Sequence, residues 1–423
     1  MRKPGLRPES SVLFYQTGTE SIIRKRQIFH LGGYDPAPPS AVRHRFAREL
    51  RRFEATWCVK ASVAEAEADD DAWKVIASGP NWRVETRYRL VRWDDIIAAG
   101  GRRPMWQRIP LGLLAFVDFF TGAFWRYLRA NWRYAAFFLY PFLLFAALAA
   151  LSASIGIMVA KAGGSALLGA GVGLVSFVVL LHWPGRRLYL SFLFDDWIFS
   201  RRYVWQGHAD LDSRLDKMAR EVAAASRDPE IDEIVVIGHS LGAVLAIDLL
   251  DRTLRLNPSL GQEGASVALL SVGSSILKIG LHRGAKRFRD AVERVASAPG
   301  IFWGDYQALS DVMNFYKKDP IAEMGLKTSR GPLVRIVRIR HMLDPHVYAS
   351  MRYDPLRMHC QFVSGNNRRA AYDYFMLLCG PLPVERQVRS PDGAVSAIGA
   401  DGTLLETTTA KPPAPEVLDS NRQ

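Results

Sequence analysis

The stretch IDEIVVIGHSLGAVLAIDLL, residues 231–250, decides the fold because it joins two apolar runs through a short Gly-His-Ser-Leu-Gly turn. In a Gly-x-Ser-x-Gly turn between a strand and a helix, Gly238 and Gly242 leave room for a sharp bend that lifts the hydroxyl of Ser240 above the sheet. The backbone N–H of Leu241, at the start of the helix, can then bind a developing oxyanion. The stretch predicts a nucleophilic serine, and an ordinary serine in a strand–helix turn is the alternative.

Strand-like stretches alternate with helical patterns on both sides of this turn. Amphipathic or polar helices are expected at 40–57 and 207–226, and apolar residues recur at helical spacing in the first of them. The expected strands are 11–18, 26–33, 72–78, 84–93, 232–238, 266–275, 301–307 and 333–342. Strands that alternate with helices predict an α/β fold with a doubly wound, mostly parallel sheet.

Two long stretches without Asp, Glu, Lys or Arg interrupt this pattern at about 134–160 and 162–182. About twenty apolar helical residues cross a bilayer core of about 30 Å. Neither stretch has the polar stripe that a helix in a soluble domain keeps. They predict a two-helix transmembrane hairpin, with a buried hairpin in a soluble domain as the alternative. The preceding stretch 110–125 is too short to span easily and contains Asp118, so we expect an interfacial helix there.

Positive residues flank the hairpin on its two outer sides, whereas the turn between the helices offers only Lys161. The flanking residues are Arg126, Arg129, Arg133, Arg186, Arg187, Arg201 and Arg202. Positive residues stay on the cytoplasmic side, so both soluble parts should face the cytoplasm, and a bacterial inner membrane is the expected location. If the strands before and after the insertion share one sheet, the insertion must cross the membrane an even number of times.

Four segments follow from these patterns. Residues 1–109 and 201–383 are expected to form the two parts of one α/β domain, with the membrane insertion at 110–200 between them. Residues 384–423 are polar and rich in Pro, Thr and Gly, which predicts a disordered tail. The net charge of +13 fits the positive flanks of the membrane spans, and no nucleic-acid-binding motif accompanies it.

The strand–turn–helix around GHSLG resembles the nucleophile region of the α/β-hydrolase superfamily, in its lipase and esterase branch. The resemblance extends to the strand order and covers most of 12–380 apart from the membrane insertion. It implies a Ser-Asp/Glu-His triad in that chain order and an oxyanion loop after an early strand. The sequence Leu31-Gly32-Gly33-Tyr34 resembles such a loop. By analogy the N–H of Tyr34 is the second oxyanion donor and Gly33 allows close approach, with an ordinary glycine turn as the alternative.

Chain order within this family limits the choice of base. Of the nine histidines only His341, His346 and His359 follow the later strands. A structural role is expected for His341, at the end of an arginine-rich strand. His359 lies in an expected loop after the last strand and before a helical pattern at 369–380, where the family's base belongs. His359 is therefore the predicted base, and His346 is the alternative.

The family acid lies in the loop after the strand at 301–307, which offers two aspartates. Asp305 lies within that strand and points poorly. Asp311 fits the loop best, and Asp319 is the alternative. The acid would hold the tautomer of the histidine and stabilise the imidazolium.

These residues predict a membrane-anchored serine hydrolase that cleaves carboxylic esters by acyl transfer to water. A lipidic ester is expected from the position at the bilayer, while a thioester or an acylated protein stays open. The mechanism needs no cofactor and no metal, and Cys58, Cys360 and Cys379 lack metal-ligand spacing. A catalytically inactive hydrolase fold that serves as a membrane scaffold is the alternative.

Overall fold

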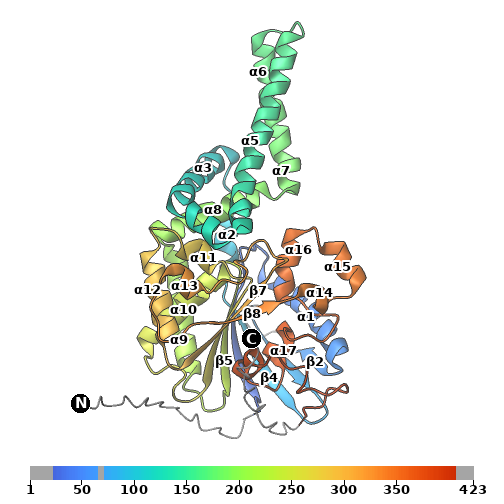
Figure 1. Cartoon of the computed structure of the whole chain (residues 1–423), viewed down its shortest axis with the longest axis vertical. Helices are drawn as coiled ribbons and strands as arrows, with labels where there is room; N and C mark the ends of the chain where they lie inside the picture. The colour runs from blue at the N-terminus through green and yellow to red at the C-terminus, as the bar shows by residue number, and fades with distance from the viewer. Residues whose placement is uncertain (1–21, 65–70, 406–423) are drawn as a thin grey trace, which may run out of the picture.

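The computed structural model describes residues 22–64 and 71–405, and an eight-stranded β-sheet forms its centre (Figure 1). The strands are β1 (Lys25–Leu31), β2 (Lys60–Val63), β3 (Ala72–Ser78), β4 (Arg83–Leu90), β5 (Glu233–His239), β6 (Ser266–Val272), β7 (Ile301–Ala308) and β8 (Leu333–Val337). Their spatial order is β2-β3-β4-β1-β5-β6-β7-β8. Only β3 runs against the others, so the expectation of an α/β fold with a mostly parallel sheet is confirmed.

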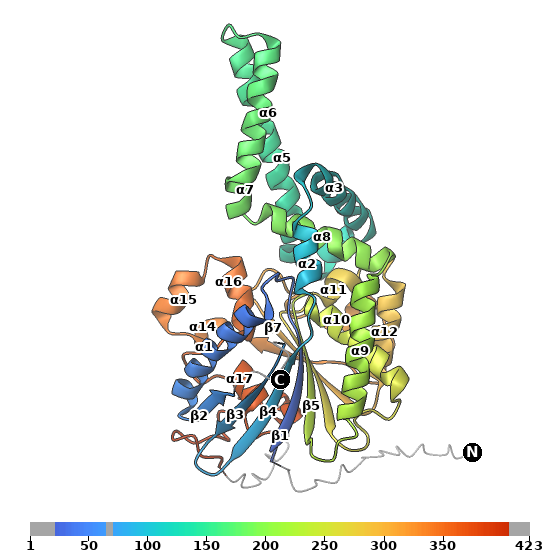
Figure 2. The ribbon, with the colours of Figure 1, turned by 180° about the vertical axis from the view of Figure 1, so that it is seen from behind.

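Helices cover both faces of the sheet, and the residues of β5 show why (Figures 1 and 2). All seven residues of β5 are buried, as expected for a parallel strand between two layers of helices. Ile234 and Val236 belong to the core shared with α9 (Ala209–Ala225), α10 (Gly242–Leu256) and α12 (Lys286–Ser297). Val235 and Ile237 belong to the opposite core, with α1 (Pro39–Trp57) and α17 (Tyr374–Cys379).

The remaining helices lie between β4 and α9 or in the segments that follow β6, β7 and β8. Between β4 and α9 they are α2 (Asp94–Gly101), α3 (Met105–Gly122), α4 (Phe124–Ala130), α5 (Trp132–Lys161), α6 (Ala166–His182), α7 (Pro184–Arg187) and α8 (Leu190–Trp205). The later ones are α11 (Ile276–Gly280), α13 (Pro320–Met324), α14 (Ile339–Met342), α15 (Pro345–Met351), α16 (Pro355–Cys360), the 3-10 helix Gln361–Val363, and α18 (Val384–Arg389).

Two strands and one helix differ from the sequence predictions. The short edge strand β2 was not predicted, because its four residues carry no apolar run. The expected strand 333–342 ends at Val337, and Ile339 begins α14. The expected helix 369–380 is shorter in the structure, where it is α17. Asp373 caps α17 by accepting from the N–H of Met376. The expected strand 11–18 lies outside the described residues.

Helices α5 and α6 pack side by side and extend away from the sheet as a helix pair (Figure 1). Asn131 caps α5 by accepting from Arg133 N and Tyr134 N, and Ser165 caps α6. The two backbones approach closely where glycines face each other: a Cβ on Gly156 would lie 2.5 Å from the carbonyl oxygen of Gly169. The expected second stretch 162–182 is shorter in the structure, because the turn lasts until Ser165.

Length and composition make one described helix, α5, suitable for crossing a membrane. Helices α3 and α4 reach the same criterion only as a pair, and they are bent by 61° at their junction. Helix α6 has 17 residues and is apolar but shorter. The structure therefore supports one candidate span by this measure, where the sequence predicted two.

Strands on both sides of the insertion join one sheet. Strand β1 pairs in parallel with β4, which precedes the insertion, and with β5, which follows it. The two ends of the insertion consequently return to the same edge of the sheet. Because the parts of the chain before and after the insertion share one sheet, they lie on the same side of any membrane that the insertion crosses, which requires an even number of crossings.

The prediction of a disordered tail from Val384 onward is wrong for residues 384–405. Val384 and Val388 in α18 are fully buried, and Ile398 packs in the same core. The N–H of Val384 donates to Glu233 Oε1 at 2.8 Å, and Glu233 forms a buried ion pair with Arg26 of β1. The polar composition concealed apolar residues that are spaced too irregularly to form a recognisable pattern. Residues 406–423 lie outside the described part of the chain.

Candidate active site

Ser240 lies in a strained turn between β5 and α10. Its φ of 55° is in the left-handed region, which residues other than glycine adopt rarely. Its N–H donates to the carbonyl of Val272 at 3.1 Å, and its own carbonyl accepts from Ser275 at 3.1 Å. The backbone of the neighbouring strand and the loop after it therefore hold this conformation.

The flanking glycines make the turn possible because there is no space for a side chain. A Cβ on Gly238 would lie 2.2 Å from the Cα of Ala243, and one on Gly242 would lie 2.1 Å from the carbonyl oxygen of Leu31. Both contacts are with backbone, which cannot move aside. The Gly-x-Ser-x-Gly pattern is thus a steric requirement of this turn.

The loop after β1 lies directly against the serine. A Cβ on Gly33 would lie 3.0 Å from the Cβ of Ser240, so a side chain there would crowd the hydroxyl. The amide nitrogens of Tyr34 and Leu241 donate to no backbone carbonyl within 22–64 and 71–405. Leu241 follows Ser240 in the chain and Tyr34 follows Gly33, so both N–H groups stay candidates for the oxyanion hole.

His359 and Asp311 form a buried pair, although 48 residues separate them in the chain. His359 Nδ1 lies 2.8 Å from Asp311 Oδ2, and both side chains are almost fully buried. The other carboxylate oxygen of Asp311 accepts from the N–H of Met313 at 2.8 Å. His359 Nε2 is buried and has no hydrogen-bond partner in the described part of the protein. In the tautomer in which Nδ1 donates to Asp311, Nε2 is the nitrogen with a free lone pair.

The alternative acids and base have other positions. Asp319 caps α13 by accepting from the N–H of Ile321 at 2.8 Å. Asp305 lies within β7, where it binds Ser271 Oγ at 2.5 Å and Gln307 Nε2 at 2.6 Å. His346 is exposed on α15. None of the three pairs with His359, so the structure brings together the first choice for each role.

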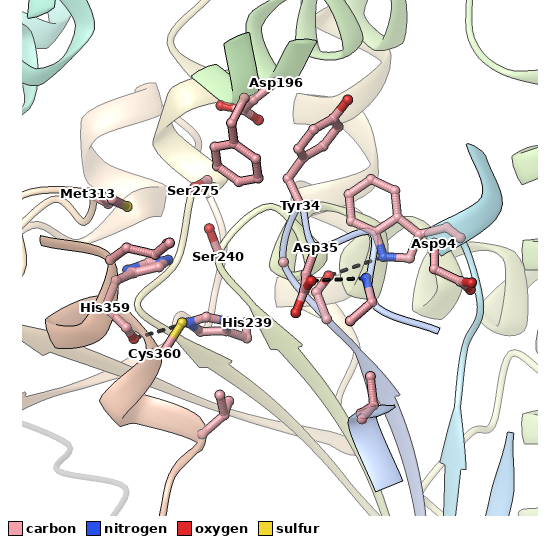
Figure 3. Close-up of a pocket in the computed structure, with 18 of the residues that line it drawn as sticks. Tyr34, Asp35, Asp94, Asp196, His239, Ser240, Ser275, Met313, His359 and Cys360 are labelled. Atoms are coloured by element: carbon pink, nitrogen blue, oxygen red, sulfur yellow. Dashed lines mark hydrogen bonds between the residues drawn. The ribbon is translucent and has the colours of Figure 1, made fainter. Parts of the chain in front are cut away.

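Ser240 and His359 line the same cavity (Figure 3), which has a volume of about 320 Å³. The cavity lies at the C-terminal edge of the sheet, where parallel α/β proteins bind their ligands. One wall comes from the insertion, through Tyr134 and Phe137 of α5 and Phe192 of α8. The loop around Tyr34 and the segment around His359 form the opposite walls.

The chain matches no known family model, no curated protein and no solved structure. The chemistry of the cavity is therefore inferred from the strained serine and the buried His–Asp pair. Among the described residues, no group of three or more His, Cys, Asp and Glu side chains is placed to hold a metal ion.

His239 is a residue of the site whose contacts the sequence did not indicate. Its Nε2 lies 3.2 Å from the carbonyl oxygen of His359, and the two rings lie 4.5 Å apart (Figure 3). Burial lowers the pKa of His239 well below its usual value, so the ring stays neutral and can donate to that carbonyl. His30, on β1, is also buried, and burial lowers its pKa to about 3. Both histidines are therefore uncharged at neutral pH.

The local structure around His359 differs from the expected loop. His359 lies in the last turn of the short helix α16, which Asp354 caps through the N–H groups of Leu356 and Arg357. Pro355 begins this helix, as is common for the first helical position. A six-residue helix is too short to produce an amphipathic pattern, so the sequence did not reveal it.

Proposed function

We propose that this protein is a membrane-anchored serine hydrolase with an α/β-hydrolase fold, which cleaves carboxylic esters through Ser240, His359 and Asp311. One observation carries the proposal: Ser240, in its strained turn, lines the same cavity as His359, and His359 Nδ1 is bound to the buried Asp311. Nucleophilic serine catalysis needs these three groups and no others for proton transfer.

The proposed mechanism assigns one step to each group. Ser240 Oγ attacks the ester carbonyl while His359 Nε2 takes its proton, and Asp311 stabilises the resulting imidazolium through Nδ1. The N–H groups of Leu241 and Tyr34 bind the oxyanion, with Gly33 allowing the close approach. His359 then protonates the leaving alcohol. A water molecule that gives its proton to His359 next attacks the acyl-enzyme, which releases the carboxylic acid and restores Ser240.

The surface of the helix pair supports membrane anchoring. Only 22% of the most apolar part of α5 is buried, whereas the core helix of a soluble protein is mostly buried. Large apolar side chains of α6 are also exposed, including Leu167, Leu174 and Val175. With 17 residues, α6 is at the short end of the range of about 17–25 residues that span a bilayer.

Helices α3 and α4 suit the interfacial position expected for residues 110–125. Trp106 in α3, Trp125 in α4 and Trp132 at the start of α5 are largely exposed, and tryptophan prefers the membrane–water interface. Asp118 is turned away from this surface, since it accepts from Trp205 Nε1 at 2.7 Å. A carboxylate that is bound within the protein does not oppose contact of α3 with lipid.

A lipidic ester is the proposed substrate because the insertion forms one wall of the cavity and would hold its entrance at the bilayer. A thioester or an acylated protein would use the same three groups. A catalytically inactive scaffold is the competing proposal, and it requires no activated serine.

An alkyl fluorophosphonate separates these proposals because it forms a covalent adduct with an activated serine. We expect the full-length protein in detergent to be labelled on Ser240, with the adduct located by mass spectrometry. A folded protein that the probe leaves unlabelled would favour the scaffold.

Asp311→Asn is expected to lower the kcat for a soluble ester by about 10⁴-fold, because an amide would favour the wrong tautomer of the histidine. Asp319→Asn should lower it less than about threefold, since Asp319 only caps the short helix α13. Steady-state hydrolysis of a p-nitrophenyl ester measures both. A larger loss for Asp319→Asn would assign the acid to Asp319.

Reporters fused to the C-terminus and inserted near residue 100 are expected on the cytoplasmic side, and one at Lys161-Ala162 on the opposite side. The reasons are the arginine-rich flanks and the single sheet formed from both parts of the chain. A phosphatase and a fluorescent-protein reporter at each position would measure the sides. Reporters near residue 100 and at the C-terminus on opposite sides would contradict the topology.

A further inference from the structure

The cavity that contains Ser240 has no unpaired charge among its described lining residues. Three cations and three carboxylates line it, and each cation is bound to one carboxylate. The pairs are Arg45–Asp35 at 3.1 Å, Arg92–Asp94 at 3.2 Å and Lys278–Asp196 at 2.5 Å. The other ionisable groups of the wall include His30 and His239, which burial keeps neutral.

Lys278 is the most buried of these cations, and its ammonium group has partners within the protein on two sides. Lys278 is 4% exposed at its side chain, and Asp196 is 13% exposed. The Lys278 ammonium also lies over the ring of Trp197, 4.1 Å from its centre. A cation that is bound on two sides and shielded from water cannot also bind a ligand anion without losing a partner.

The rest of the lining is suited to hydrocarbon. Tyr134, Phe137 and Phe192 form the wall at the base of the helix pair, and Leu356 and Val363 lie on the side of His359. A volume of about 320 Å³ is at the lower end for cavities that hold drug-sized ligands. It is too small for two long acyl chains.

We propose that the substrate is a single-chain ester whose alcohol part is uncharged, of the monoacylglycerol type, and that esters with a phosphate head group are excluded. This inference rests on the proposed hydrolase function and names its substrate class. A phosphate next to the ester would meet as many carboxylates as cations, so no net positive charge would offset the water that it leaves. The cavity would thereby select the substrate by the charge of its head group, while its apolar wall would bind the acyl chain.

Two lipids that differ by one phosphate test this selection. The full-length protein is given 1-oleoylglycerol or 1-oleoylglycerol 3-phosphate in micelles of the same nonionic detergent, and released oleate is measured. We expect kcat/KM to be at least about tenfold higher for the uncharged lipid. Equal values, or a preference for the phosphate, would overturn the inference.

One substitution tests whether charge in the cavity is the cause. Asp94→Asn leaves Arg92 without its carboxylate, and both side chains are partly exposed, so the fold should tolerate the change. We expect the preference for the uncharged lipid to fall by about threefold, since the added charge is partly screened by solvent. Glu385→Gln makes the same change in the exposed pair Glu385–Arg389 of α18, away from the cavity, and should leave the ratio unchanged. Equal effects of the two substitutions would overturn the explanation by charge in the cavity.

The labelling experiment distinguishes failure of this inference from failure of the proposed function. Cleavage of neither lipid by a protein whose Ser240 reacts with fluorophosphonate would overturn the substrate class and retain the hydrolase. Absence of labelling would overturn the hydrolase and the substrate class together.

Discussion

Ser240→Ala is expected to lower the kcat for ester hydrolysis by about 10⁶-fold, to the residual rate that substrate binding and the oxyanion hole supply by themselves. The oxygen that forms the acyl-enzyme is then missing, and no other residue in the cavity has the same position. The protein should stay folded, because the three backbone hydrogen bonds of residue 240 do not involve its side chain. It should also stay in the membrane fraction.

The measurement is steady-state hydrolysis of a p-nitrophenyl ester by the detergent-solubilised protein. Ser350→Ala is the matched control, since Ser350 is exposed on α15 and its hydroxyl binds only the carbonyl of Val347. The control should keep its activity within about twofold. Activity of Ser240→Ala within a few fold of the wild type would contradict the role of this serine.

His359→Ala is expected to lower kcat by a similar factor of about 10⁶, because the serine loses its general base. His346→Ala should change kcat by less than about twofold, since His346 is exposed and lies outside the cavity. The same ester assay measures both variants. The opposite ranking would assign the base to His346.

Removal of His359 also leaves the carboxylate of Asp311 buried without its partner, which can destabilise the protein. His359→Asn is therefore the second variant, because an amide can still donate to Asp311 Oδ2 while it cannot act as a base. We expect the same loss of activity with a melting temperature near that of the wild type. An active His359→Asn protein would contradict the proposed proton transfer.

His239 is expected to influence the site through the position of His359. It supports the backbone carbonyl of His359 and lies beside its ring, and it remains neutral because it is buried. A neutral neighbour does not repel the imidazolium that forms when His359 takes the proton of Ser240. The residue between Gly238 and Ser240 thereby contributes to the site although it is not one of the three proposed catalytic groups.

The sequence by itself was sufficient for the serine turn, because the requirement is local. Gly238, Ser240 and Gly242 are adjacent in the chain, and the apolar runs around them predict the strand and the helix that they join. The apolar stretches of the insertion were equally visible, since they depend on composition over about twenty residues. The sequence also ranked Asp311 and His359 first, but only by the chain order of a family that it resembles.

The tertiary structure decided which acid and which base meet, where the cavity lies and what forms its walls. Asp311 and Asp319 both follow β7 in the chain, and the packing of α16 against the loop after β7 places His359 beside Asp311. The wall formed by Phe137 and Phe192 comes from an insertion whose residues show no pattern for such contact. Val384 is likewise joined to a distant strand, since its N–H donates to Glu233 of β5. Local sequence determines backbone conformation within a few residues, whereas these contacts join segments far apart in the chain and exist only after the sheet has formed.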